Sequence, residues 1–136
     1  MIRKEERAAW LSALEEAGFT LFRDGGNFLQ LTQPEGWRWP LDLMLVSQTT
    51  FAPMLATARP AQVGETGFQI PSLEHLLALK FHVLKQEIPG RGFKDLMDVL
   101  TLAECNGVDL RSDRIRELCE QFGSTKVYER VLAFKG

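Results

Sequence analysis

The sequence predicts an α+β fold, in which a small mixed sheet flanked by helices is followed by a C-terminal helical half. Three observations lead to this prediction. Residues 1–70 contain strand-like alternation and turn sequences, and the residues after Pro71 have helical periodicity. The order of elements is one helix, a run of strands and a run of helices, whereas a wound parallel sheet would alternate strands and helices throughout.

The composition is that of a globular protein. The 136 residues include 16 Lys and Arg against 18 Asp and Glu, and 45% are hydrophobic. Such a chain is too apolar for intrinsic disorder and too evenly charged for a surface built wholly to bind nucleic acid. We therefore expect one domain over residues 1–136, with a helix and short sheet in 1–70 and a helical half in 71–136.

The apolar segments and the two cysteines of the sequence bear on where the protein is located. No apolar run approaches the ~20 residues that span a bilayer, and the first residues are charged where a signal peptide is apolar. These features predict a cytoplasmic protein that does not contact membranes. Cys105 and Cys119 lie among hydrophobic neighbours without zinc-ligand spacing, so we expect two buried free thiols.

The first half begins with a helix and continues with strands. Residues 3–17 predict a helix with Trp10 and Leu14 on one face, which ends at Gly18. Alternation predicts strands at 19–22, 27–32 and 41–46, and Asp24-Gly25-Gly26 favours a hairpin turn between the first two. Residues 50–58 can form a short helix, and 61–70 a small hairpin or an extended loop.

The second half is helical. Ser72 is a suitable N-cap for a helix over residues 73–87. Further helices are expected at 93–106, 112–122 and 124–134, and glycines follow the first two of these.

Asp42 interrupts an apolar strand. Alternation places it opposite Leu41, Leu43 and Leu45, on the face of Met44 and Val46. An ionised carboxylate buried there needs a cation, a metal ion or water at the mouth of a site. Alternatively, Asp42 lies at a strand end, where it accepts hydrogen bonds from a loop or pairs with an Arg.

Lys80 interrupts the apolar stripe of the helix after Pro71. Its stem can cover apolar surface while the ammonium reaches water, or the ammonium can meet a carboxylate or a phosphate at the edge of the sheet. Because Asp42 and Lys80 have opposite charges, we expect them to face the same side. His75 and His82 project from the polar face of this helix and are predicted to be surface residues.

A charged run follows at Gly90-Arg91-Gly92-Phe93-Lys94-Asp95-Leu96-Met97-Asp98. Phe93, Leu96, Met97, Leu100 and Ala103 form the predicted buried stripe, so Lys94, Asp95 and Asp98 should lie on the polar side. Asp95 and Asp98 would repel each other unless Arg91, Lys94 or Lys80 stands between them. Acidic residues in a first helical turn are also favoured by the helix dipole alone.

Three stretches together resemble a known family. They are Leu41-Asp42-Leu43-Met44-Leu45-Val46, then Pro71-Ser72-Leu73-Glu74-His75-Leu76-Leu77-Ala78-Leu79-Lys80, and Arg91 with Lys94-Asp95-Leu96-Met97-Asp98. This pattern resembles the C-terminal two-thirds of nucleotidyltransferase-fold proteins related to the AbiEii-type toxins of type IV toxin–antitoxin systems. The resemblance implies a partial nucleotidyltransferase fold in which carboxylates of a small sheet hold Mg²⁺ and the triphosphate of an NTP.

The resemblance also implies roles for individual residues. Asp42 matches the third acid of the family, a catalytic and metal-binding residue, and carboxylates on a strand suit that chemistry. Lys80, Arg91 and Lys94 would bind the nucleotide. Asp95 and Asp98 would support the helices around the cleft.

The sequence departs from the family in its metal motif. The glycine turn and the Asp-x-Asp strand of the family should lie upstream of the matching region and are not found. If Gly25-Gly26 is taken as that turn and Asp42 as the first acid, Met44 stands where the second acid should be. One Asp cannot hold two Mg²⁺ ions and a triphosphate, so enzymatic activity is left open.

Three functions are compatible with these features. The first is a shortened or degenerate nucleotidyltransferase-like protein without independent catalysis. The second is an active, Mg²⁺-dependent, toxin-like nucleotidyltransferase that another chain or an upstream segment completes. The third is a helical module that binds proteins or DNA, although its basic residues alternate with acidic ones, which predicts weak DNA binding. The basic residues are Arg111, Arg114, Arg116, Lys126, Arg130 and Lys135.

A sheet without its first strands would leave an edge open, and open edges invite pairing. We therefore expect a homodimer, or a complex with a protein from a neighbouring gene, through the sheet side. Trp37 and Trp39 precede the Asp42 strand and could cover or anchor such a surface.

Overall fold

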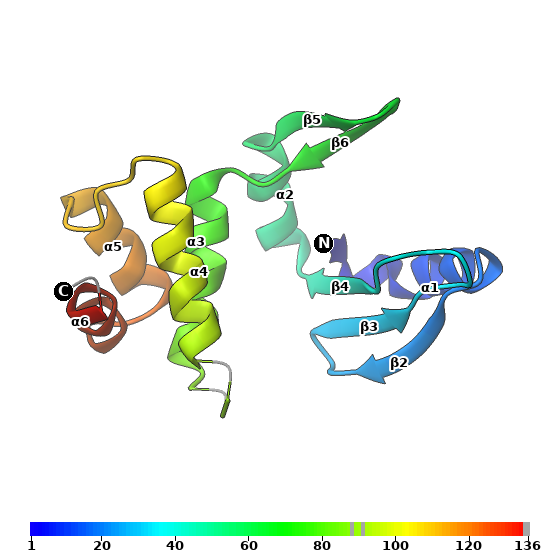
Figure 1. Cartoon of the computed structure of the whole chain (residues 1–136), viewed down its shortest axis with the longest axis horizontal. Helices are drawn as coiled ribbons and strands as arrows, with labels where there is room; N and C mark the ends of the chain where they lie inside the picture. Colours follow the sequence, from blue (N-terminus) through cyan, green and yellow to red (C-terminus); the bar gives the residue numbers. More distant parts are fainter. Residues whose placement is uncertain (88, 91, 135–136) are drawn as a thin grey trace. The chain divides into compact units, whose positions relative to one another are not determined.

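The computed structural model describes residues 1–87, 89–90 and 92–134, and it confirms the α+β class (Figure 1). The chain divides into two compact units, Met1–Thr57 and Ala58–Gly136. We call them the sheet unit and the helical unit. The division falls before the second hairpin, whereas the sequence changes to helical periodicity only after it.

The sheet unit contains a four-stranded mixed sheet with the strand order β1-β4-β3-β2. Strands β2, β3 and β4 are antiparallel neighbours, and β1 pairs with β4 in parallel. The elements of this unit, in chain order, are β1 (Ile2–Arg3), a 3-10 helix (Lys4–Glu6), α1 (Arg7–Glu16), β2 (Thr20–Asp24), β3 (Phe28–Thr32), β4 (Leu41–Val46) and α2 (Gln48–Ala56).

Alternation along β3 and β4 builds the core of the sheet unit, as the sequence predicts. The buried side chains are Ile2, Phe19, Leu29, Leu31, Leu43 and Leu45. Leu11 and Leu14 of α1 pack against this cluster, whereas Trp10, which was predicted to share a face with Leu14, is exposed. At the turn between β2 and β3, Gly26 has φ +77° and donates its N–H to Asp24 Oδ1.

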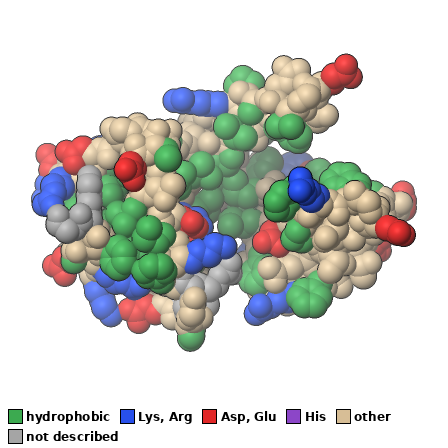
Figure 2. Space-filling view, viewed as in Figure 1, with side chains coloured by type: hydrophobic (Ala, Val, Ile, Leu, Met, Phe, Trp, Pro, Cys, Tyr) green, Lys and Arg blue, Asp and Glu red, His purple; other side chains and the backbone are tan. Residues whose placement is uncertain are grey.

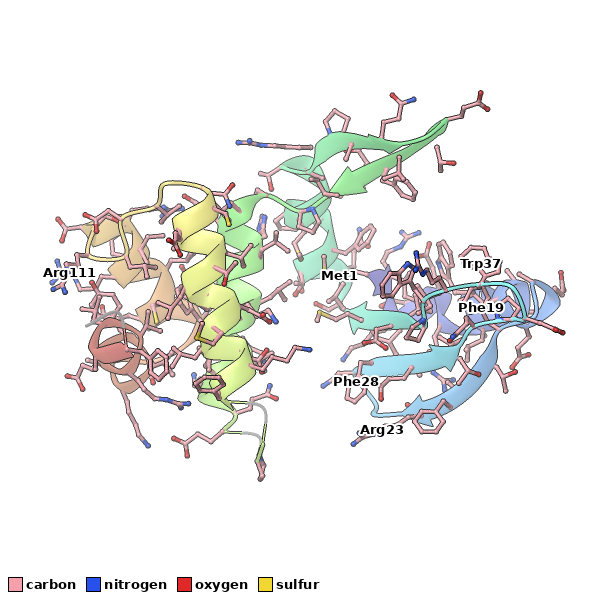
Figure 3. The ribbon with its side chains drawn as sticks, viewed as in Figure 1. Met1, Phe19, Arg23, Phe28, Trp37 and Arg111 are labelled. Atoms are coloured by element: carbon pink, nitrogen blue, oxygen red, sulfur yellow. The ribbon has the colours of Figure 1, made fainter. Side chains whose placement is uncertain are left out.

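The sheet edge beside β4, which was expected to be open, is paired with β1. Residues 3–17 were expected to be one helix, but Ile2 and Arg3 are extended and pair with Leu45 and Val46 of β4. The N-terminal residues of the chain thus cover part of the edge that was expected to be open. Trp37 is exposed in the loop before β4, where its ring meets that of Phe19 edge-to-face at 5.3 Å (Figure 3).

The helical unit begins with a hairpin of β5 (Arg59–Val63) and β6 (Thr66–Ile70), one of the two forms that the sequence allowed. Four helices follow close to their predicted bounds. They are α3 (Leu73–Lys85), α4 (Gly92–Cys105), α5 (Asp113–Phe122) and α6 (Thr125–Phe134).

The core of the helical unit is formed by these four helices. The side chains of Leu77, Phe81, Val99 and Val131 are almost fully buried in it. Ser72 caps α3, because its hydroxyl oxygen accepts the N–H of His75, as expected for a residue of this type before a helix.

The buried face of α4 differs from the predicted one. Phe93 is 66% exposed and Met97 is 38% exposed, although both were expected inside. Phe93 instead packs edge-to-face against Phe134 of α6, with ring centroids 5.6 Å apart. The buried residues of α4 are Asp95, Leu96, Val99 and Ala103. The prediction that Asp95 lies on the polar side is therefore wrong.

Candidate functional site

Lys80 connects α3 and α4. Its ammonium donates hydrogen bonds to Asp95 Oδ1 at 3.0 Å and to Asp98 Oδ2 at 2.5 Å. The lysine thus stands between two carboxylates that lie three residues apart on one helix and would otherwise repel each other. Lys80 meets carboxylates, as one of its two interpretations expected, but these belong to α4 and not to the edge of the sheet. We call these three residues the Lys80 cluster.

Burial is uneven within the Lys80 cluster. Asp95 is 4% exposed, whereas the side chains of Lys80 and Asp98 are 31% and 36% exposed. Burial by itself lowers the pKa of Lys80, but the hydrogen bonds that its ammonium donates to Asp98 and Asp95, with the charges of these carboxylates, outweigh burial and raise the pKa. Lys80 is therefore held in its charged form, which offsets the cost of burying Asp95.

The rotation of α4 brings Asp95 into this cluster. Leu96, Val99 and Ala103 recur at spacings of three and four, and Asp95 lies four residues before Val99 on the same side. The predicted stripe omitted Val99, which is the residue that would have revealed the correct face. Asp95 Oδ2 is buried without a hydrogen-bond partner among the described residues.

Asp42 lies on the exposed face of β4. It faces Gln30 across the strands β3 and β4, and the Gln30 side-chain amide donates to Asp42 Oδ1 at 3.4 Å. Of the two interpretations of Asp42, the one in which its carboxylate is buried is wrong, because the core forms on the opposite face, where Leu43 and Leu45 point. A pair between Asp42 and Lys80 was expected because both charges were thought to be buried, but Asp42 is exposed. Lys80 has its partners, Asp95 and Asp98, within the helical unit.

The other predicted site residues are dispersed. Lys94 is exposed on α4, and Arg91 lies outside the described residues. His82 is exposed, as predicted, with Nε2 at 2.9 Å from the Gln86 side-chain nitrogen. His75 is half-buried, with Nδ1 at 3.0 Å from Ser72 Oγ.

The residues around Asp42 do not fit a Mg²⁺–triphosphate site. Such a site needs several oxygen ligands, and here one carboxylate stands beside one amide. Over residues 1–87, 89–90 and 92–134, no three His, Cys, Asp or Glu side chains come together in a way that could hold a metal ion.

A hollow of about 460 Å³ is present elsewhere in the sheet unit. It is lined by Arg3, Glu5, Glu6 and Gln48, and none of the predicted site residues is among them. Arg3 pairs with Glu6 and lies 5.9 Å from the Phe51 ring centroid. The hollow is thus lined by one arginine, already paired, two acidic residues and one glutamine.

Several basic residues of the terminal helices are paired. Arg114 binds both carboxylate oxygens of Glu74, Arg116 pairs with Asp113, and Lys126 pairs with Glu87. Arg111, labelled in Figure 3, is exposed in the turn before α5, and its backbone N–H donates to Asp109 Oδ1. Lys135 lies outside the described residues. Because these ion pairs reduce the positive charge of the terminal helices, we expect only weak attraction to a polyanion such as DNA.

The two cysteines have different environments. Cys105 is exposed, which corrects the prediction of two buried thiols, and Cys119 is buried. Burial raises the pKa of the Cys119 thiol to about 11.

Comparison of the chain with protein-family models, with curated proteins and with solved structures finds no match. The family resemblance therefore rests on the sequence motifs alone. Within the described part of the chain, no helix has both the length and the apolar character needed to cross a membrane.

Proposed function

We propose that the chain is a nucleotidyltransferase-like protein without independent catalysis, in which Lys80 supports the fold instead of binding a nucleotide. The observation that carries this proposal is the double hydrogen bond of Lys80 to Asp95 and Asp98. One positive and two negative charges leave the Lys80 cluster with a net charge of -1. A cluster of that charge repels a triphosphate.

The acidic residues support the same proposal. Asp42 has Gln30 beside it, and the sequence contains no Asp-x-Asp pair. Transfer of a nucleotidyl group needs cations that neutralise the phosphates and activate the attacking hydroxyl, and a single carboxylate holds such cations poorly.

The direct test is nucleotide binding and transfer by the full chain. Calorimetry with Mg²⁺ and ATP should show no saturable heat, and labelled ATP should transfer no nucleotide to the protein or to RNA. Robust labelling that disappears in Asp42→Asn, but persists in the exposed control Glu35→Gln, would contradict the proposal.

The second candidate is an active nucleotidyltransferase that another chain or an upstream segment completes. It is favoured by the exposure of Asp42, whose carboxylate is open to additional ligands on β4. Under this alternative, labelling appears only when the completing protein or segment is added, and Asp42→Asn abolishes it. Labelling that survives Asp42→Asn would exclude a catalytic role for this residue.

A further inference from the structure

The hairpin β5–β6 has one mostly apolar face, which also carries Arg59 and Thr66 at its two ends, and one face without large apolar side chains. Its register pairs Ala61 with Phe68 and Val63 with Thr66, so these side chains share a face with Ile70. Val63, Phe68 and Ile70 are 72%, 48% and 47% exposed, and Figure 2 shows hydrophobic side chains at the hairpin surface. A two-stranded hairpin is marginally stable in water, and further strands alongside it add stability.

The two edges of this hairpin differ in their hydrogen-bonding groups. A two-residue turn, Gly64-Glu65, is closed by a hydrogen-bonded pair, and bonded and non-bonded pairs then alternate along the ladder. Residues 60 and 62 of β5 and residues 67 and 69 of β6 therefore direct their backbone groups outward. Pro60 has no N–H, so the edge of β5 is incomplete, whereas Gly67 and Gln69 leave β6 with two donors and two acceptors.

Among the residues that the structure describes, nothing requires a glycine at position 67. A Cβ atom added at this position would have no heavy atom within 4 Å, and its φ is not in the left-handed region. Glycine inside a strand weakens it and often marks a place where another backbone approaches closely. This residue thus lies at the edge that is open to pairing.

We propose that β6 is a dimerisation edge, at which two copies of the chain join their hairpins into one four-stranded sheet. The strands pair antiparallel about Phe68, so that Gly67 lies opposite the partner's Gln69 and exchanges both backbone hydrogen bonds with it. Phe68 faces the partner's Phe68 at the intervening non-bonded position, where aromatic pairs stabilise a ladder. The two apolar faces then form one continuous surface.

Charge favours the antiparallel arrangement. Arg59 lies at the base of the hairpin and Glu65 at its tip. Antiparallel pairing of β6 brings the base of one copy beside the tip of the other, so each end of the sheet carries both charges. A second copy of the chain therefore matches the β6 edge in its backbone hydrogen-bonding groups, its apolar face and its charges.

The first test compares proline substitutions at outward positions of the two strands. Gln69→Pro removes a donor from the β6 edge and should raise the dimer dissociation constant at least about tenfold in sedimentation equilibrium. Gln62→Pro alters the incomplete β5 edge and should leave that constant unchanged. Circular dichroism of both variants checks that the chain stays folded. A monomeric wild-type protein at high micromolar concentration, or equal effects of the two prolines, would overturn the proposal.

The second test is disulfide trapping in a Cys105→Ser background, which removes the exposed thiol. Phe68→Cys should form a dimer under mild oxidation, because facing Cα atoms at a non-bonded pair are about 4.5 Å apart. Val63→Cys is the matched control, since it lies on the same apolar face but on the outer strand of the proposed sheet. Faster cross-linking through Val63→Cys would mean face-to-face association and would contradict pairing through β6.

Discussion

The sheet unit and the helical unit accommodate a charged residue within an apolar pattern in opposite ways. On β4, Asp42 points away from the core, because successive side chains of a strand alternate between its faces. On α3, Lys80 lies among residues that pack against a second helix, and Asp95 and Asp98 of that helix neutralise it. A strand can expose such a charge without an opposite charge beside it, whereas a packed helix requires a compensating charge from its neighbour.

The sharpest test of this comparison is Lys80→Met. The change leaves Asp95 buried without its cation, so the free energy of unfolding should fall by about 2 to 4 kcal/mol. Urea denaturation followed by circular dichroism measures this loss. The matched control Lys94→Met removes an exposed lysine of α4 and should change stability by less than about 0.5 kcal/mol. Equal losses would show that Lys80 is not a structural link.

A double substitution distinguishes the loss of the Lys80 side chain itself from the cost of leaving the Asp95 carboxylate buried without a cation. Adding Asp95→Leu to Lys80→Met removes the buried carboxylate and should restore more than half of the lost stability, because apolar replacement of a buried ion pair is often nearly neutral. Urea denaturation of the two single variants and the double variant gives the coupling energy. Additive losses would mean that Lys80 and Asp95 stabilise the fold independently.

The raised pKa of Lys80 predicts a dependence of stability on pH. A lysine whose pKa is higher in the folded than in the unfolded chain stabilises fully below the unfolded value, about 10.4, and loses this effect as pH rises through the folded value. Asp95 and Asp98 are the charges that raise it. Between pH 9 and strongly alkaline pH, the wild-type protein should therefore lose more stability than Lys80→Met does. A parallel decline of the two proteins would contradict this assignment.

The smallest expected effect is that of Asp42→Asn. The residue is exposed and its hydrogen bond with Gln30 is long, so unfolding free energy should change by less than about 0.5 kcal/mol. Asp95→Asn should cost clearly more, because it weakens a buried charge pair. Thermal unfolding of the two variants side by side would contradict the comparison if Asp42→Asn were the more damaging.

The elements could be predicted from the sequence because their patterns are local. The strand over residues 41–46 and the helices after Ser72 follow from alternation, helical periodicity and capping residues. Strand β1 could not be predicted, since two residues carry no pattern and only β4 selects their conformation. The environment of Asp95 was wrongly predicted because one omitted valine changes the inferred face of α4.

The candidate site was less predictable than the fold. The sequence shows that Asp42 and Lys80 are unusual, but not which charges compensate them, because that depends on tertiary packing. Arg91 lies outside the described residues, so its proposed role stays a prediction. The partial nucleotidyltransferase fold and the association through the sheet side also stay predictions.

Because Cys119 is buried, the rate at which a thiol reagent labels it reports how often the helical unit opens. With a pKa of about 11, only about one thiol in ten thousand is ionised at pH 7 while the unit is closed. A small alkylating reagent should therefore label the exposed Cys105 at once and reach Cys119 only during excursions that separate the helices around it. The ratio of the two labelling rates measures how often those helices part under native conditions, in a chain that carries no added probe.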